Sequence, residues 1–166
     1  MSIPARISKL VWGLVLLSTV AAMGPLASPA AAKRCRSLLC LVNGARAGHG
    51  LPALMESARL DRSARLRALA IRRCAEFSHT ACGQPFRQVF VRAGYRGREL
   101  GENLCWGSGR LGSPTSTLAA WRTSPEHRAN LLGRSWRRVG VARIRAKRLF
   151  GASNVTVWVM QFGGRA

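Results

Sequence analysis

The side chains best suited to chemistry lie in three short motifs set far apart along the chain. These are Phe77-Ser78-His79, Gly101-Glu102-Asn103-Leu104 and the segment 121–132, WRTSPEHRANLL, which contains His127. Two of the three histidines and two of the six carboxylates of the chain lie in them. Imidazole and carboxylate groups bind metals and transfer protons near neutral pH, so the three motifs together predict a functional cleft.

A metal site is the first chemistry that these residues suggest. His79, Glu102 and His127 could supply the three protein ligands of an open zinc-type site and leave one position for water or substrate. His127 follows Ser124 and Pro125, which can begin a helix, and the positive end of the helix dipole favours neutral imidazole, the form that binds metal. In the alternative, each residue only caps a helix or accepts backbone hydrogen bonds. The site permits Zn²⁺ or another divalent cation without requiring one, and no other cofactor is indicated.

Residues 1–32 have the layout of a secretory signal peptide. Arg6 and Lys9 precede an apolar run from Leu10 to Met23, and small residues lead to a cleavage site after Ala32. A retained membrane anchor is the alternative, but this run is shorter than the ~20 apolar residues that span a bilayer. We therefore predict a secreted protein, extracellular or periplasmic, with no transmembrane segment in the mature chain.

The chain is strongly basic, with a formal net charge of +21. Loss of residues 1–32 removes two basic residues and no acidic ones, which leaves +19. Such a surface attracts anionic partners, which for an exported protein are envelope polymers or lipid headgroups. Nucleic acid is not expected, because no recognised reader motif interleaves the arginines with aromatic residues. We expect a monomer.

All five cysteines follow the predicted leader, and an oxidising compartment permits disulfides. Spacing does not fix connectivity, but local pairing favours Cys35–Cys40 and Cys74–Cys82, with Cys105 left unpaired. The second bridge would close a loop around His79 and contribute about 2.5 kcal/mol in the chain-entropy model. A zinc finger is not indicated, because no Cys-x-x-Cys pair is present.

The hydrophobic pattern predicts one mixed α/β domain over residues 38–166, after a short extension at 33–37. The last predicted strand is apolar on both faces, and a sheet buried on both sides needs helices above and below it. The expected fold is therefore a three-layer α–β–α sandwich. Helices are predicted from Ser37 to Gly48 or Gly50, from Glu56 to Phe77, from Pro85 to Gly94, from Ser113 and from Ser124 to Gly133. Strands are predicted at 102–106, 139–144 and 155–162.

In their order along the chain, the motifs resemble bacterial members of the CAP superfamily, the short relatives of cysteine-rich secretory proteins, antigen 5 and plant pathogenesis-related proteins. The resemblance runs from about Leu38 to Gly163 and implies the same sandwich, with a small, mainly antiparallel central sheet. Besides the three motifs above, it rests on Asn43-x-x-Arg46, Gly50-Leu51, Gly94-Tyr95, Val139-Gly140-Val141 and Gln161-Phe162-Gly163.

The resemblance also implies a central cleft with two histidines and two glutamates, in which some members bind a divalent metal through the imidazoles. His79 and Glu102 match the first pair, and His127 matches the second histidine. The longer relatives carry Trp-x-x-Glu, whereas Ser124 stands at the place of that glutamate here. Glu126 is a weak substitute, because neighbours on a helix point in different directions. Asn103, Ser124 and Glu126 are accordingly assigned to support of the cleft.

Two classes of function follow. In the favoured one, the protein is a secreted, non-enzymatic module whose cleft binds a divalent metal or a small ligand, lipids included. In the alternative, the same cleft is a metal-dependent hydrolase or protease, with zinc-bound water as nucleophile and Glu102 as general base. The missing fourth ligand and the absence of His-Glu-x-x-His weaken the catalytic case. A serine or cysteine hydrolase lacks a nucleophile-elbow motif, and the glycine-rich segment 107–112 lacks the acidic partner of a dinucleotide site.

Overall fold

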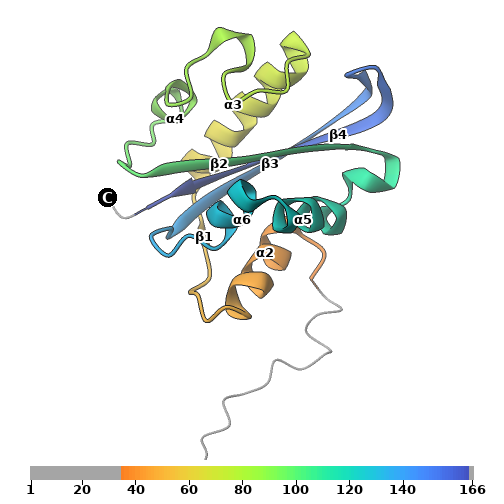
Figure 1. Ribbon diagram of the computed structural model, residues 1–166. Coiled ribbons are helices and arrows are strands. Elements are labelled where there is room, and N and C mark those ends of the chain that lie inside the picture. Colours follow the sequence, from red (N-terminus) through yellow and green to blue (C-terminus); the bar gives the residue numbers. More distant parts are fainter. Residues whose placement is uncertain (1–34, 165–166) are drawn as a thin grey trace, which may run out of the picture.

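Helices cover both faces of a single sheet in the computed structural model, which describes residues 35–164 (Figure 1). The predicted leader at 1–32 lies outside the described residues. The predicted mixed α/β sandwich is confirmed. Its elements are α2 (Leu38–Ala47), β1 (Met55–Glu56), α3 (Ala58–Cys74), η1 (Ala81–Gly83), α4 (Gln88–Arg92), β2 (Leu100–Ser108), η2 (Gly109–Gly112), α5 (Pro114–Thr123), α6 (Pro125–Leu131), β3 (Arg138–Leu149) and β4 (Ala152–Gly163).

The sheet has the strand order β1-β3-β4-β2 and is antiparallel except for β1, which pairs with β3 in parallel over two residues. The three long strands extend beyond their predicted bounds. β3 and β4 form a hairpin in which Leu149 lies opposite Ala152, and Phe150 and Gly151 between them have φ values of 52° and 74°. Positive φ at both positions matches the right-handed twist of a two-residue hairpin. A two-residue strand has no pattern of its own, and β1 was therefore not predicted.

Side chains of β4 alternate between two hydrophobic cores, as the sequence predicts. Val155, Val157 and Val159 face α3, while Trp158, Met160 and Phe162 face the layer of α2, α5 and α6. Both sets are buried. The sheet therefore has helices on both sides because its central strand presents apolar surface to both.

Serine and proline residues begin the helices on the second face. The Ser37 hydroxyl accepts a hydrogen bond from the Cys40 N–H at 3.2 Å, and Ser113 caps α5 in the same way. Two helices are shorter than predicted. α3 ends at Cys74, because Ala75 takes a left-handed conformation with φ 50°. α4 begins at Gln88 rather than at Pro85.

Both predicted disulfides are present, Cys35–Cys40 and Cys74–Cys82, with Cα–Cα distances of 5.5 and 5.6 Å. Cys105 is the free cysteine of the described part of the chain, and burial raises the pKa of its thiol. None of the helices between residues 35 and 164 has the length and hydropathy of a membrane-spanning segment.

The Asn43-x-x-Arg46 motif of α2 holds other parts of the fold in place. Asn43 exchanges two hydrogen bonds with the backbone of Leu54. The fully buried guanidinium of Arg46 donates to the carbonyls of Pro52, Leu131 and Gly133, at 3.0, 2.7 and 3.1 Å. Burial lowers the pKa of Arg46, and Arg137 lowers it further. Arg46 thereby fixes the end of α6, the helix that carries His127.

Replacing Arg46 with Leu should destabilise the fold by about 3 kcal/mol, because a charged donor is lost and the carbonyls of Pro52, Leu131 and Gly133 lose a partner. Urea denaturation followed by circular dichroism measures this change. Arg128→Leu is the matched control: Arg128 lies exposed on α6, so this variant should stay within about 0.5 kcal/mol of the wild type. Equal stability of the two variants would contradict the assigned role.

Candidate functional site

Glu102 lies at the centre of the candidate site, with its side chain fully buried on β2. Its Oε1 atom is 2.7 Å from His79 Nδ1, and its Oε2 atom accepts a hydrogen bond from Gln161 Nε2 at 2.6 Å. Gln161 lies directly opposite Glu102 in the β2–β4 pairing. Arg67 Nε approaches Oε2 to 3.7 Å, which is an ion pair and not a hydrogen bond. Both carboxylate oxygens are thus engaged within the protein.

Arg67 compensates the buried charge of Glu102 from the middle of α3. It is fully buried, and its two terminal nitrogens face the carbonyls of Gln84 and Phe86, at 3.5 and 3.4 Å. Burial lowers the pKa of Arg67, and the charge of Glu102 partly opposes that shift. Sequence reasoning missed this residue. The available signal was its place on the apolar stripe of α3, seven residues after Leu60 and four before Ile71, where a charge needs a partner.

His79 lies in the loop closed by the Cys74–Cys82 disulfide, and about half of its side chain, 51%, is exposed. A carboxylate only accepts hydrogen bonds, so His79 donates from Nδ1 to Glu102. In a neutral ring this leaves the Nε2 lone pair free for a ligand. The ring also packs edge-on against Phe86, with centroids 6.4 Å apart.

His127 lies in the first turn of α6, and its Nδ1 atom is 2.8 Å from the hydroxyl of Ser124. Its backbone carbonyl accepts a hydrogen bond from Asn103 at 2.9 Å, and Asn103 in turn accepts one from Asn130. These bonds tie α6 to β2. Ser124, at the position where longer relatives carry glutamate, is thus a partner of the second histidine.

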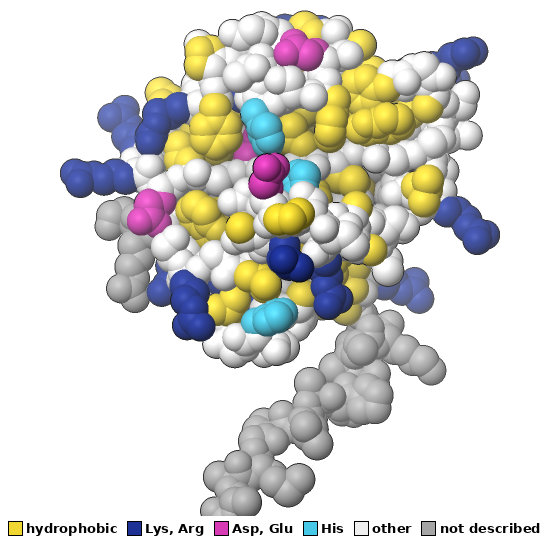
Figure 2. Space-filling model, viewed as in Figure 1, with side chains coloured by type: hydrophobic (Ala, Val, Ile, Leu, Met, Phe, Trp, Pro, Cys, Tyr) yellow, Lys and Arg dark blue, Asp and Glu magenta, His cyan; other side chains and the backbone are white. Residues whose placement is uncertain are grey.

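The two imidazoles interact electrostatically. The pKa of His127 is lowered from 6.5, first by burial and then by repulsion from His79, while Glu126 raises it. Figure 2 shows two histidine side chains close together on one face, with an acidic side chain beside them. We call His79, Glu102, Ser124 and His127 the histidine site.

An aromatic cluster includes Phe77, which lies two residues before His79 in the sequence. Phe77 and Trp106, 40% and 38% exposed, both pack against Phe150, with ring centroids 5.9 and 5.2 Å apart. Hydrophobic side chains are prominent on the face that shows the paired histidines (Figure 2). Apolar surface of this kind suits the non-polar part of a ligand.

The three-ligand metal site predicted from the sequence is not assembled in this arrangement. Among the described residues, no group of three or more His, Cys, Asp or Glu side chains is placed to hold a metal ion. The physical reason is that Glu102 faces His79, Gln161 and Arg67. Both imidazoles form their hydrogen bonds through Nδ1 rather than Nε2. Metal binding by Nε2 of His79 and Nε2 of His127 therefore stays a prediction.

Solved structures with this fold include bacterial surface and extracellular proteins. An outer surface protein of Borrelia burgdorferi matches with a TM-score of 0.66 and 20% identity over 85% of this chain and 97% of its own. An extracellular SCP-domain protein of Bacillus anthracis matches with a TM-score of 0.64 and 20% identity, over 86% of this chain and 45% of its own. A cysteine-rich secretory protein of Staphylococcus aureus matches with a TM-score of 0.62 and 17% identity, over 81% of this chain and 39% of its own. At these identities the likeness supports the fold alone. The comparison with curated proteins found no match.

The chain folds as an α–β–α sandwich and carries two neighbouring histidines beside a buried glutamate. These features define the class of protein to which the chain is similar. The sequence pattern described as CAP, Cysteine-rich secretory protein family, matches residues 39–162. The chain therefore belongs to the cysteine-rich secretory protein (CAP) family, as the motifs of the sequence predict.

Replacing Glu102 with Gln should destabilise the fold by roughly 3 kcal/mol, because the charge of Arg67 then stays buried without a counter-charge. The double variant Arg67→Met/Glu102→Gln should recover most of this loss, because it removes both charges. Urea denaturation of both variants measures the effect. Glu99→Gln, an exposed carboxylate three residues earlier, is the control and should change stability little. A double variant less stable than Glu102→Gln would refute the pairing.

The His127 imidazole should titrate below pH 6.5, and NMR of its ring protons measures this directly. His79→Gln should raise the pKa of His127, because a neighbouring positive charge is lost, whereas Glu126→Gln should lower it. His49→Gln should leave it unchanged. The unfolded chain takes up this proton more readily than the fold does, so His127 makes the fold less stable as pH falls through 6.5 toward the lowered pKa. A pKa above 6.5 would contradict this account.

Proposed function

We propose that this protein is an exported CAP-type binding module that holds a divalent metal ion through Nε2 of His79 and Nε2 of His127. One observation carries the proposal: both histidines are anchored through Nδ1, to Glu102 and to Ser124, which leaves the opposite nitrogen of each free. Metal-binding histidines usually donate their other ring N–H to a carboxylate or another protein acceptor. The buried Glu102 has this supporting role for His79.

The donor set fits Zn²⁺ or another metal that accepts imidazole ligands. The lowered pKa of His127 supports this, because a neutral imidazole is needed and this ring stays neutral to a lower pH than an ordinary histidine. Two protein ligands leave the other positions to water or to a small ligand. When bound, the metal would supply a positive centre for an anionic or carbonyl group of such a ligand.

Binding is better supported than catalysis. Catalytic zinc sites usually have three protein ligands. Glu102, the general base of the hydrolase alternative, has both oxygens engaged by His79, Gln161 and Arg67. A fully buried carboxylate with a hydrogen-bond partner on each oxygen is poorly placed to accept a proton from water.

Export to the cell envelope or beyond is the second part of the proposal. The leader-like segment 1–32, the two disulfides and the strong positive charge support it. Two solved relatives are described as an outer surface protein and an extracellular protein. The exposed aromatic residues Phe77 and Trp106 suit a ligand with an apolar part, a lipid included.

Calorimetric titration with Zn²⁺ tests the metal site. The wild-type protein should bind one equivalent, and His79→Gln and His127→Gln should each weaken binding by about tenfold or more, because each removes one of two ligands. His49→Gln is the matched control: it removes the third histidine, which is exposed beyond α2, and binding should not change.

Equal binding by the wild type and the His79→Gln/His127→Gln variant would remove the metal proposal. Turnover of peptide, ester or glycan substrates that depends on added Zn²⁺ and on both histidines would favour the hydrolase instead.

A further inference from the structure

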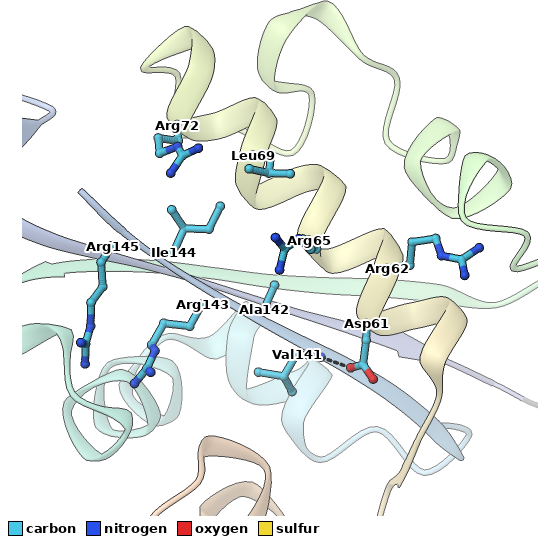
Figure 3. Close-up of a pocket in the computed structure, with 10 residues that line it drawn as sticks. All are labelled: Asp61, Arg62, Arg65, Leu69, Arg72, Val141, Ala142, Arg143, Ile144 and Arg145. Atoms are coloured by element: carbon cyan, nitrogen blue, oxygen red, sulfur yellow. Dashed lines mark hydrogen bonds between the residues drawn. The ribbon is translucent and has the colours of Figure 1, made fainter.

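A second site lies at the opposite edge of the sheet from β2 and Glu102. Here a groove of about 650 Å³ runs between α3 and β3 (Figure 3). Its lining is dominated by arginine. Arg62, Arg65 and Arg72 come from α3, and Arg143 and Arg145 come from β3. Asp61 is the acidic residue that lines it. None of the five arginines forms an ion pair with another residue of the described chain.

The floor of the groove is an open strand edge. β1 covers β3 only at Arg138 and Val139, after which the chain leaves the sheet and enters α3. Within residues 35–164, no strand pairs with this edge of β3 beyond Val139. Unpaired strand edges offer backbone donors and acceptors to another extended chain.

The direction of the backbone groups follows from one hydrogen bond. The Val141 N–H donates to Asp61 Oδ1 at 2.9 Å and therefore points away from β4 (Figure 3). In an antiparallel ladder, alternate residues direct N–H and C=O to the same side. Arg143 and Arg145 lie two and four residues after Val141. Their backbone N–H and C=O groups therefore also point to the open edge, away from β4.

Arginine side chains flank this edge on both sides. Ile144 packs in the core under α3, whereas the guanidinium of Arg143 lies 5.5 Å from the centre of the Trp158 ring, on the opposite face of the sheet. Arg62, Arg65 and Arg72 lie above the edge on α3, and Arg143 and Arg145 lie below it (Figure 3). A ligand along the edge would thus meet positive charge from both faces.

We propose that this groove binds an extended acidic peptide segment of a partner protein, which adds to the free edge of β3 as a further strand. Backbone hydrogen bonds to residues 143 and 145 supply affinity, and carboxylates on alternate positions, which share one face of the added strand, pair with Arg143 and Arg145. The site is separate from the histidine site and does not depend on a metal.

Two features within the chain favour a peptide over other anions. Asp61 already places a carboxylate on the first open N–H of this edge, and β1 already pairs with its first two residues. A lipid headgroup or phosphate polymer would use the guanidinium groups but not the strand edge. A second copy of this chain is disfavoured, because its β3 edge carries the same positive charges.

The test uses a rhodamine-labelled peptide with alternating Glu and Val. Its length of about eight residues is within the usual range for a strand. Fluorescence anisotropy should detect binding to the wild type. Arg143→Gln/Arg145→Gln should weaken it by about tenfold or more, because two charge-assisted contacts are lost. Arg96→Gln/Arg122→Gln, an equal change of charge at exposed positions outside the groove, should change affinity by no more than about twofold.

A second peptide separates strand addition from attraction of charge alone. Its backbone is N-methylated, so it has the same charge but no amide donors, and it should bind at least about tenfold more weakly. In addition, the parent peptide should slow hydrogen exchange at the amides of Arg143 and Arg145. The His79→Gln/His127→Gln variant should bind the parent peptide like the wild type.

Three results would overturn the proposal. These are no binding of the parent peptide, equal binding of its N-methylated form, and unchanged exchange at residues 143 and 145 in the complex. Binding of inorganic polyphosphate with the same dependence on Arg143 and Arg145, without peptide binding, would assign the groove to phosphate polymers instead.

Discussion

The buried charge of Glu102 is the constraint on which the rest of the structure depends. A carboxylate inside a protein needs hydrogen bonds and a counter-charge, and here these come from a loop, from β4 and from α3, through His79, Gln161 and Arg67. Because each partner belongs to a different element, the charge can be accommodated only when the sheet, the disulfide loop and α3 are all in place. The same arrangement sets the orientation of the His79 ring. Stability and site geometry therefore share one cause.

The second histidine depends on a different set of bonds. α6 is short, and its position is fixed by Asn103 at its start and by Arg46 at its end. Ser124 begins this helix without capping it through its side chain, and its hydroxyl faces His127 instead. Ser124 thus supplies a hydrogen-bond partner for the imidazole and carries no negative charge. An uncharged hydroxyl at this place favours the proposed site with two histidine ligands.

The sequence predicted those features that a local pattern or a motif can carry. The amphipathic stripe of α3, the two apolar faces of β4 and the serine before α2 each follow from the side chains of one segment. The motifs identified His79, Glu102 and His127, because their types are rare in this basic chain. What was missed depends on distant partners: the role of Arg67 is set by Glu102, and β1 exists only because β3 lies beside it. The early end of α3 at Ala75 likewise depends on a backbone conformation that no residue pattern signals.

Charge distribution explains how a protein with 27 basic residues could hold a cation. Two of its six carboxylates lie beside the histidines: Glu102 accepts a hydrogen bond from His79, and Glu126 raises the pKa of His127. At physiological salt, charges more than about 8 Å apart at the surface are largely screened. Nearby groups such as these two carboxylates therefore act on the imidazoles more strongly than the distant charges that make up the net charge. Five arginines line the groove at the free edge of β3, which β4 separates from β2 and its Glu102. The proposed metal site and the proposed peptide site thus lie at opposite edges of the sheet, and the large net charge need not oppose the metal site.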